Sequence, residues 1–203
     1  MIRLFVGLEL PAEMRTWLSL LRGGVPGARW VDPENYHVTV RFIGEVDEGR
    51  FDDIASALSR IRASTFDLTL EGVSTFGKES MPHTLWVGVR RNDTLQALHA
   101  KVDRALVNIG FDPEGRRYSP HVTIARLKVA ATMRLGTFVA ANSLFRAGPA
   151  PVDGFALFSS FLSRNGAIYR PEARYSLAGG VPEGEGDEGL GVGLEDGVED
   201  GAA

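Results

Sequence analysis

The sequence predicts an α+β fold in which one unit is duplicated and the two copies form two lobes around a central cleft. Stretches with strict alternation of polar and apolar residues, typical of half-buried strands, are interleaved with stretches that have the apolar spacing of amphipathic helices. The same order of elements also occurs twice. Residues 4–8 (Leu-Phe-Val-Gly-Leu) match 85–89 (Leu-Trp-Val-Gly-Val), and each is followed by a helix, an Asp-Pro-Glu turn and a strand that carries His-x-Thr. The offset is 81 residues for the first pair and 84 for the histidines, so a pseudo-two-fold axis would bring the two His-x-Thr strands to one cleft.

The first copy opens with a strand and a helix. Residues 2–10 (IRLFVGLEL) are expected to form the strand, and 11–21, which start with a proline, the helix. The glycines and the proline of residues 23–27 end that helix. The turn at 32–35 (Asp-Pro-Glu-Asn) then leads into a strand over 36–44, which a glycine ends.

The middle of the chain alternates between helices and strands. Residues 47–62 have one apolar face at helical spacing and predict a helix. Residues 66–76 and 84–89 alternate and predict two strands joined by a loop at 77–82. Residues 93–109 predict a further helix, because five apolar side chains form one stripe and a glycine follows as a stop. The stripe consists of Leu95, Leu98, Val102, Leu106 and Ile109.

The last part of the chain adds the second His-x-Thr strand and three more elements. The strand follows a second Asp-Pro-Glu-Gly turn, and the final pair of strands reads as a hairpin because Asn-Gly favours a two-residue turn. The expected ranges are 120–126 for the His-x-Thr strand, 133–141 for a short helix, 152–162 and 167–177 for the two final strands, and 165–166 for their turn.

The two His-x-Thr strands carry the residues from which we expect function. Alternation through the first strand places His37, Thr39 and Arg41 on one face and apolar side chains on the other. The pattern recurs with His121 and Thr123. An imidazole, a hydroxyl and a guanidinium on an exposed sheet face favour an anion site, which makes Arg41 a candidate for substrate contact. The alternative is a pair of strand histidines that only form hydrogen bonds in a core.

Three further basic residues need separate placement. Arg126 lies five residues past His121, so an unbroken strand would point it to the opposite face, and a bulge or the end of the strand would have to return it. His83 begins a strand and is expected at the rim of the site. His99 lies beside the apolar stripe of its helix, where we expect a solvated or capping role.

Length and composition fit a globular protein. With 203 residues, 44% of them apolar, the chain can bury a substantial core. It has no apolar run long enough to span a membrane and no basic-then-apolar leader, so we expect neither a membrane span nor secretion. Cysteine is absent, which excludes disulfides, thiolate metal sites and cysteine nucleophiles. We expect a cytoplasmic monomer.

The net charge of −4 conceals two pieces of opposite sign. Residues 179–203 contain eight acidic residues and nine glycines but no Lys or Arg. Without them, residues 1–178 have 22 basic against 18 acidic residues, a net charge of +4. The tail has too few large apolar side chains to offset the entropy lost on ordering. We therefore expect one bilobal domain over residues 1–178 and a disordered acidic tail over 179–203.

The sequence resembles the 2H phosphoesterase superfamily, whose hallmark is two His-x-Thr/Ser-x motifs. It is most similar to the branch of RNA 2′,3′-cyclic phosphodiesterases, historically called 2′-5′ RNA ligases. The motifs here are His-Val-Thr-Val at 37–40 and His-Val-Thr-Ile at 121–124, with Val and Ile in place of the commoner Leu. The resemblance runs from about residue 3 to residue 177 and excludes the tail. It implies a bilobal α+β fold with an antiparallel sheet in each lobe, flanking helices and an active-site cleft between the lobes.

The resemblance also implies roles for single residues. His37 is similar to the family's proton donor and His121 to its proton acceptor, while Thr39 and Thr123 would contact phosphate. Arg126 matches the arginine that follows the second motif in many members. We expect no metal or other cofactor. The expected partner is RNA with a 2′,3′-cyclic phosphate end or a small cyclic nucleotide.

The residue types suit hydrolysis of a cyclic phosphodiester. Water must lose a proton to a base, and the departing ribose oxygen must receive one from an acid. Histidine suits both roles, because its ordinary pKa of about 6.5 lets one imidazole be neutral and the other charged near neutral pH. Two hydroxyls and an arginine can donate hydrogen bonds to the phosphorane oxygens. We expect metal-independent hydrolysis that, as the family implies, leaves a 2′-phosphate.

Three alternatives stay open from the sequence. The same acid and base can run in reverse and join RNA ends through a 2′-5′ linkage. A catalytically silent module that binds RNA ends or nucleotides would keep the threonines and arginines but would not need both histidines. A two-histidine metal protein would need further ligands, and neither His-x-Thr strand contains Asp or Glu before Glu45.

Overall fold

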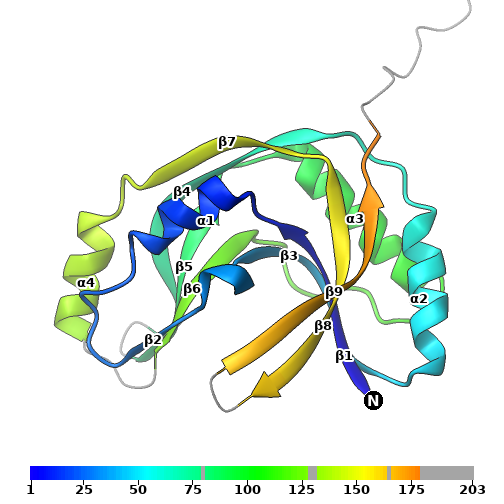
Figure 1. Ribbon diagram of the computed structural model, residues 1–203, viewed down its shortest axis with the longest axis horizontal. Coiled ribbons are helices and arrows are strands. Elements are labelled where there is room, and N and C mark those ends of the chain that lie inside the picture. Colours follow the sequence, from blue (N-terminus) through cyan, green and yellow to red (C-terminus); the bar gives the residue numbers. More distant parts are fainter. Residues whose placement is uncertain (79–80, 128–131, 164–165, 179–203) are drawn as a thin grey trace, which may run out of the picture.

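The part of the chain that the structure describes covers nearly all of the expected domain. The computed structural model describes residues 1–78, 81–127, 132–163 and 166–178 (Figure 1). The expected acidic tail at 179–203 and Asn165 of the expected hairpin turn lie outside the described residues. None of the helices in the described ranges is long and apolar enough to cross a membrane.

The strands form two antiparallel sheets. Their bounds are β1 (Ile2–Glu9), β2 (Ala28–Trp30), β3 (His37–Val46), β4 (Phe66–Lys78), β5 (Met81–Val89), β6 (His121–Leu127), β7 (Arg146–Val152), β8 (Gly154–Ser163) and β9 (Gly166–Ser176). The four-stranded sheet has the order β3-β1-β8-β9, and the five-stranded sheet has the order β2-β6-β5-β4-β7. Each neighbouring pair in these orders is antiparallel.

Helices flank both sheets. They are α1 (Ala12–Ser19), α2 (Gly49–Ser59), α3 (Asp93–Val107) and α4 (Thr132–Ala141), with a short 3₁₀ helix at Pro33–Asn35. In Figure 1, α2 and α3 lie on the side of β9, whereas α1 lies beneath β7 and near β4. The expected bilobal α+β fold, with an antiparallel sheet and flanking helices in each lobe, is confirmed.

The two copies of the repeat exchange parts with each other. The pair β1 and β3 of the first copy corresponds to the pair β5 and β6 of the second. A later strand of each copy crosses over, since β4 pairs with β5 and β8 pairs with β1. The helix that lies between the two strands of each pair in the sequence also packs on the other lobe, because α1 contacts β7 and α3 contacts β3. Each lobe therefore contains chain from both copies, and the equivalent strands β3 and β6 contact each other where the lobes meet.

A continuous apolar core joins the two lobes. On β3 and β6 the apolar residues next to the His-x-Thr positions are fully or almost fully buried, as the alternation predicted: Val38, Val40, Val122 and Ile124. Phe42, which the same alternation placed on this apolar face, is 49% exposed instead. On α3, the predicted stripe is buried from Leu95 to Leu106, and Ile109 lies beyond the end of the helix, partly buried. The helix begins where the Asn92 side chain accepts a hydrogen bond of 2.9 Å from the N–H of Leu95. Burying each large aliphatic side chain stabilises the fold by about 1.5 to 3 kcal/mol.

Two strands were not predicted from the sequence. β7 contains Pro149 and Pro151, which cannot donate backbone hydrogen bonds. It forms a strand because it lies at the edge of its sheet, where each residue needs a partner on one side only. β2 has three residues and follows a glycine-rich turn, so it is too short to show any alternation. Both strands depend on neighbours that are distant in the sequence.

Several element boundaries also differ from the prediction. β3 continues to Val46 because Gly44, with φ near +100°, lies inside an irregularity of the pairing with β1 and does not end the strand. β4 and β5 extend into the predicted loop at 77–82 and pair there as a hairpin. Local patterns indicate where elements lie but do not show how far the pairing continues.

The substitution Gly148→Ala should destabilise the fold. Gly148 has φ near +96°, and a Cβ there would lie 2.6 Å from the backbone oxygen of Leu68 and from the end of the Met14 side chain. The left-handed backbone and the clash together should lower the free energy of unfolding by about 2 to 5 kcal/mol. The matched control is Gly136→Ala, in helix α4 with open space around it. That change should leave stability equal or raise it by up to about 1 kcal/mol. Equal stabilities of the two variants in urea unfolding would contradict the prediction.

Candidate active site

A cleft of about 770 Å³ lies between the two lobes. One wall comes from β1, β3, β8 and β9, and the other from β2 and β6. Five of the six expected site residues line the cleft: His37, Thr39, His121, Thr123 and Arg126. The structure thus brings together the polar residues of both His-x-Thr motifs, and Arg41 is the one expected site residue that does not line the cleft.

The two imidazoles are held in the same way. His37 and His121 are the first residues of β3 and β6. In each ring Nδ1 lies 2.8 Å from the backbone carbonyl oxygen two residues earlier, at Asn35 and at Ser119. A carbonyl oxygen can only accept, so each Nδ1 carries the hydrogen and donates it. Nε2 of each ring therefore holds the lone pair that can take up a proton.

Aromatic side chains surround both imidazoles. Tyr169 and His37 make an edge-to-face contact with ring centroids 4.8 Å apart, and the ring of Phe5 lies at the same distance from His37. Phe76 meets His121 in a similar edge-to-face contact at 4.7 Å. These contacts fix the orientation of each ring and exclude water from much of its surface.

The aromatic surroundings make a charged imidazole unfavourable in the free protein. Burial lowers the pKa of His37 to about 4, an effect that the bond to the Asn35 carbonyl opposes in part. The positive charges of His121 and Arg126 lower it further. Burial, and then the charge of Arg126, also lower the pKa of His121. An anion in the cleft would favour the charged form of both rings and raise both pKa values.

A bulge in β6 brings Arg126 to the cleft. Thr123 pairs with Trp86 and Ala125 with Leu85, so Ile124 is an extra residue that the partner strand does not match. Ile124 and Ala125 are both fully buried, and Arg126 returns to the face of His121 and Thr123. This is the break in alternation that the sequence required for Arg126 to reach the site. Its Nη1 donates a 2.8 Å hydrogen bond to the hydroxyl of Thr84.

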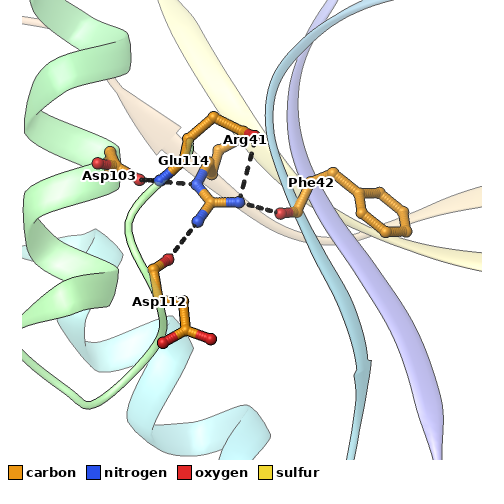
Figure 2. Close-up of polar contacts among 5 residues, drawn as sticks. All are labelled: Arg41, Phe42, Asp103, Asp112 and Glu114. Carbon is orange, nitrogen blue, oxygen red and sulfur yellow. Dashed lines mark hydrogen bonds and ion pairs between the residues drawn. The ribbon is translucent and has the colours of Figure 1, made fainter. Parts of the chain in front are cut away.

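The equivalent bulge in β3 removes Arg41 from the cleft. Thr39 pairs with Gly7 and Arg41 with Val6, so Val40 is the extra residue, 84 positions before Ile124. The placement of Arg41 on the face of His37 is therefore wrong, because alternation stops at Val40. Phe42 lines the cleft in its place, with an exposed fraction of 49%. The Arg41 side chain is only 10% exposed and bonds to Asp103, Asp112 and Glu114 behind the strand (Figure 2).

Comparison with protein families agrees with the repeat and with the two motifs. The family model described as LigT like Phosphoesterase matches residues 8–86 and again residues 87–169, so it covers most of the chain in two successive segments. The chain belongs to the LigT-like phosphoesterase family. The resemblance seen in the sequence is confirmed.

Two relatives of this phosphoesterase share one name. It is 36% identical over 154 residues to an RNA 2′,3′-cyclic phosphodiesterase of Aeropyrum pernix, covering 75% of this chain and 87% of that protein. It is 31% identical over 187 residues to a protein of the same name from Thermotoga maritima, covering 89% of this chain and 98% of that one. Among solved structures, E. coli LigT complexed with 3′-AMP has a TM-score of 0.72 and 26% identity, covering 87% of this chain and 98% of the other.

Sequence reasoning missed most of the remaining residues of the cleft. Arg29 on β2 lies opposite Arg126 in the strand pairing, and Arg22 lines the same wall. Arg3 also lines the cleft and pairs with Glu45 at 2.7 Å. No periodic pattern could have assigned them, because they come from an edge strand, a turn and the far end of β1. Together they make the cleft of this phosphoesterase basic, which favours a polyanionic ligand.

The other two histidines do not line the cleft. His83 was expected at the rim, and its Nδ1 lies 2.9 Å from the hydroxyl of Thr84, the group that accepts from Arg126. His99 was expected to be solvated or to cap a helix, but it lies inside α3 and is only partly exposed. Its ring stacks parallel on Tyr118 at 4.0 Å, and its Nε2 is buried without a hydrogen-bond partner. Within the described ranges, no group of three or more His, Asp or Glu side chains is arranged to hold a metal ion.

The ring protons of the cleft histidines should report the effect of a bound anion. In NMR titrations of the free protein, His37 should stay neutral until the pH falls to its pKa of about 4. Saturating inorganic phosphate should raise the pKa of both His37 and His121, because an anion stabilises an imidazolium. His99 lies outside the cleft, so its titration should not respond to phosphate and serves as the internal control. A free-protein pKa of His37 at or above its ordinary value would contradict the burial argument.

Proposed function

We propose that this LigT-like phosphoesterase opens 2′,3′-cyclic phosphodiester ends of RNA or of nucleotides with water. The observation that carries the proposal is the pair of symmetric imidazoles, which share a tautomer and line one basic cleft. The name shared by the relatives from Aeropyrum pernix and Thermotoga maritima supports the same reaction. The complex of E. coli LigT with 3′-AMP supports a nucleotide as the small ligand.

The reaction needs one proton acceptor and one proton donor. His121 takes a proton from water through Nε2, and the water oxygen bonds to phosphorus. The bond between phosphorus and the ribose 3′-oxygen breaks, and His37 gives a proton to that oxygen. The product carries a 2′-phosphate and a 3′-hydroxyl, and the two histidines have exchanged protonation states. We take the two roles from the family pattern of the motifs.

The bound phosphate has to prepare His37 for its role. In the free protein His37, with a pKa of about 4, is neutral at pH 7. To act as the donor it must gain a proton together with the substrate, so the phosphate has to raise the pKa of His37. An anion beside His37 would also offset the repulsion from His121 and Arg126, which is one of the causes of the low pKa.

Three donors are available for the charge that builds up on phosphorus. The hydroxyls of Thr39 and Thr123 line the cleft, each two residues after its histidine. The guanidinium of Arg126 lies on the same face of β6 as Thr123. Hydrogen bonds to the non-bridging oxygens would strengthen as the phosphorane forms. The Thr84 hydroxyl, which already accepts from Nη1 of Arg126, fixes the direction of the guanidinium.

Purified protein should convert a 2′,3′-cyclic nucleotide, and an RNA with that end, to a product with a 2′-phosphate. Phosphorus NMR distinguishes the 2′-phosphate from a 3′-phosphate and from unreacted cyclic ester. EDTA should leave the rate unchanged, because the proposed acid and base are side chains. Tight binding without turnover would identify a silent binding module, and loss of turnover with EDTA would identify a metal enzyme. Adding an RNA with a 5′-hydroxyl end in excess would reveal 2′-5′ joining as a longer product.

Replacing either histidine should abolish most of the turnover. His37→Ala and His121→Ala should each lower kcat by at least about a hundredfold, the usual effect of losing a general acid or base. Thermal unfolding of both variants controls for loss of the fold. Near-wild-type turnover of a folded variant would refute the acid–base mechanism.

A modified substrate separates the two roles. When sulfur replaces the leaving 3′-oxygen, the thiolate departs without needing a proton. His37→Ala should therefore recover much of its lost rate on this substrate, whereas His121→Ala should not. Recovery of the His121 variant alone would exchange the roles and make His37 the base.

A further inference from the structure

The back of β3 is tied to the second copy of the repeat through one guanidinium. Figure 2 shows Arg41 with its partners. Nε donates to Oδ1 of Asp103 at 2.8 Å, and Nη2 donates to the carbonyl of Asp112 at 2.6 Å. Nη1 donates to the carbonyl of Phe42 and to Oε2 of Glu114, the latter at 3.3 Å. Three of these four partner residues belong to α3 or to the chain between α3 and β6.

The same region of β3 is held by a second bond. The hydroxyl of Tyr118 donates to the backbone carbonyl of Thr39 at 3.1 Å, and the Tyr118 ring stacks on His99 of α3. Oδ1 of Asp103 also accepts from the N–H of Glu114 at 3.0 Å. The segment 112–118, which leads directly to His121, is thereby fixed against both α3 and β3.

These bonds lie directly behind residues of the cleft. Thr39 and Phe42 point their side chains into the cleft, while Tyr118 and Arg41 hold their backbone carbonyls from behind. A displacement of the segment 112–118 would therefore move residues on β3 and the start of β6 relative to each other. The position in β6 equivalent to Arg41 is Ala125, which is fully buried and has no polar group in its side chain.

Arg41 forms ion pairs with two carboxylates, those of Asp103 and Glu114. Burial by itself would raise the pKa of the Asp103 carboxyl, but the hydrogen bonds from Arg41 and from the Glu114 N–H outweigh burial and hold that pKa below its usual range. The side chains of Arg41, Asp103 and Glu114 are 10%, 22% and 30% exposed, so bulk water screens this cluster less than it screens surface ion pairs. The planar guanidinium reaches four acceptors at once, which a lysine could not do.

We propose that Arg41 is a positioning residue, which ties β3 to the segment 112–118 and so holds both histidines at the separation at which they can act on one phosphate. The proposal rests on the proposed function for its kinetic test but on the bonds behind β3 for its geometry. It replaces the substrate contact expected for Arg41 with a role behind the cleft. Correct placement of two catalytic groups raises the reaction rate by large factors, so a small displacement of either histidine should lower kcat.

The test compares Arg41→Gln with a matched arginine that lacks the link to β3. Arg50 donates to the carbonyl of Ile109 at 2.7 Å and lies 4.8 Å over the ring of Phe111, so it also holds the chain that follows α3. With a 2′,3′-cyclic nucleotide, Arg41→Gln should lower kcat by about 10- to 100-fold and change KM by less than about threefold. Arg50→Gln should lower the Tm but leave kcat within about twofold of the parent protein. Arg41→Lys keeps the charge but not the planar guanidinium, so its kcat should lie between those of the parent protein and Arg41→Gln.

Two further measurements keep the proposal open to refutation. If Arg41→Gln does not fold, Tyr118→Phe removes only the bond to the Thr39 carbonyl and keeps the stack on His99. It should lower kcat at least about threefold. If a folded Arg41→Gln has a lowered Tm but an unchanged kcat, Arg41 has only a structural role and the proposal is overturned.

If the parent protein does not hydrolyse the cyclic nucleotide, the proposed function fails, and inorganic phosphate becomes the probe. Phosphate should then still shift the NMR titrations of His37 and His121 together in the parent and in Arg50→Gln. In Arg41→Gln a joint shift equal to that of the parent would overturn the positioning role.

Discussion

In a pleated strand the side chains alternate between two faces, so one unmatched residue reverses every side chain beyond it. β3 and β6 each contain such a residue, Val40 and Ile124, at equivalent positions of the repeat. Before the bulge, His-x-Thr faces the cleft in both strands, and beyond it the face belongs to Phe42 in one strand and to Arg126 in the other. The side chains that β3 and β6 contribute to the cleft are two imidazoles, two hydroxyls, one aromatic ring and one guanidinium, and this set follows from the equivalent bulge in each strand.

Alternation and repetition were enough to predict the two lobes, the central cleft and four of its polar residues. Both signals are local or depend on a constant offset, which a sequence displays directly. The position of Arg41 could not be predicted in this way, because the bulge at Val40 depends on how β3 pairs with β1, more than thirty residues away. β7 was hidden by its prolines, and the arginines at positions 3, 22 and 29 reach the cleft only through tertiary pairing. The exchange of strands between the copies likewise leaves no local trace.

Burial and the neighbouring positive charges both disfavour the charged imidazoles in this cleft. Aromatic rings orient the imidazoles but make their charged forms unfavourable, while the arginines add to that cost until an anion arrives. A basic and partly dry site of this kind is prepared for a ligand that brings its own negative charge. Behind the strands the situation is reversed, since Arg41 has its carboxylates permanently in place and needs no ligand to balance its charge.

The crossing of β4 and β8 into opposite sheets has a consequence for how such a molecule can evolve. Each sheet therefore depends on strands from both copies, and neither copy supplies a complete sheet. A single chain that carries both copies lets equivalent positions diverge, as Arg41 and Ala125 or Phe42 and Arg126 have done. Joining the copies in one chain thus permits equivalent positions of the same cleft to carry different side chains.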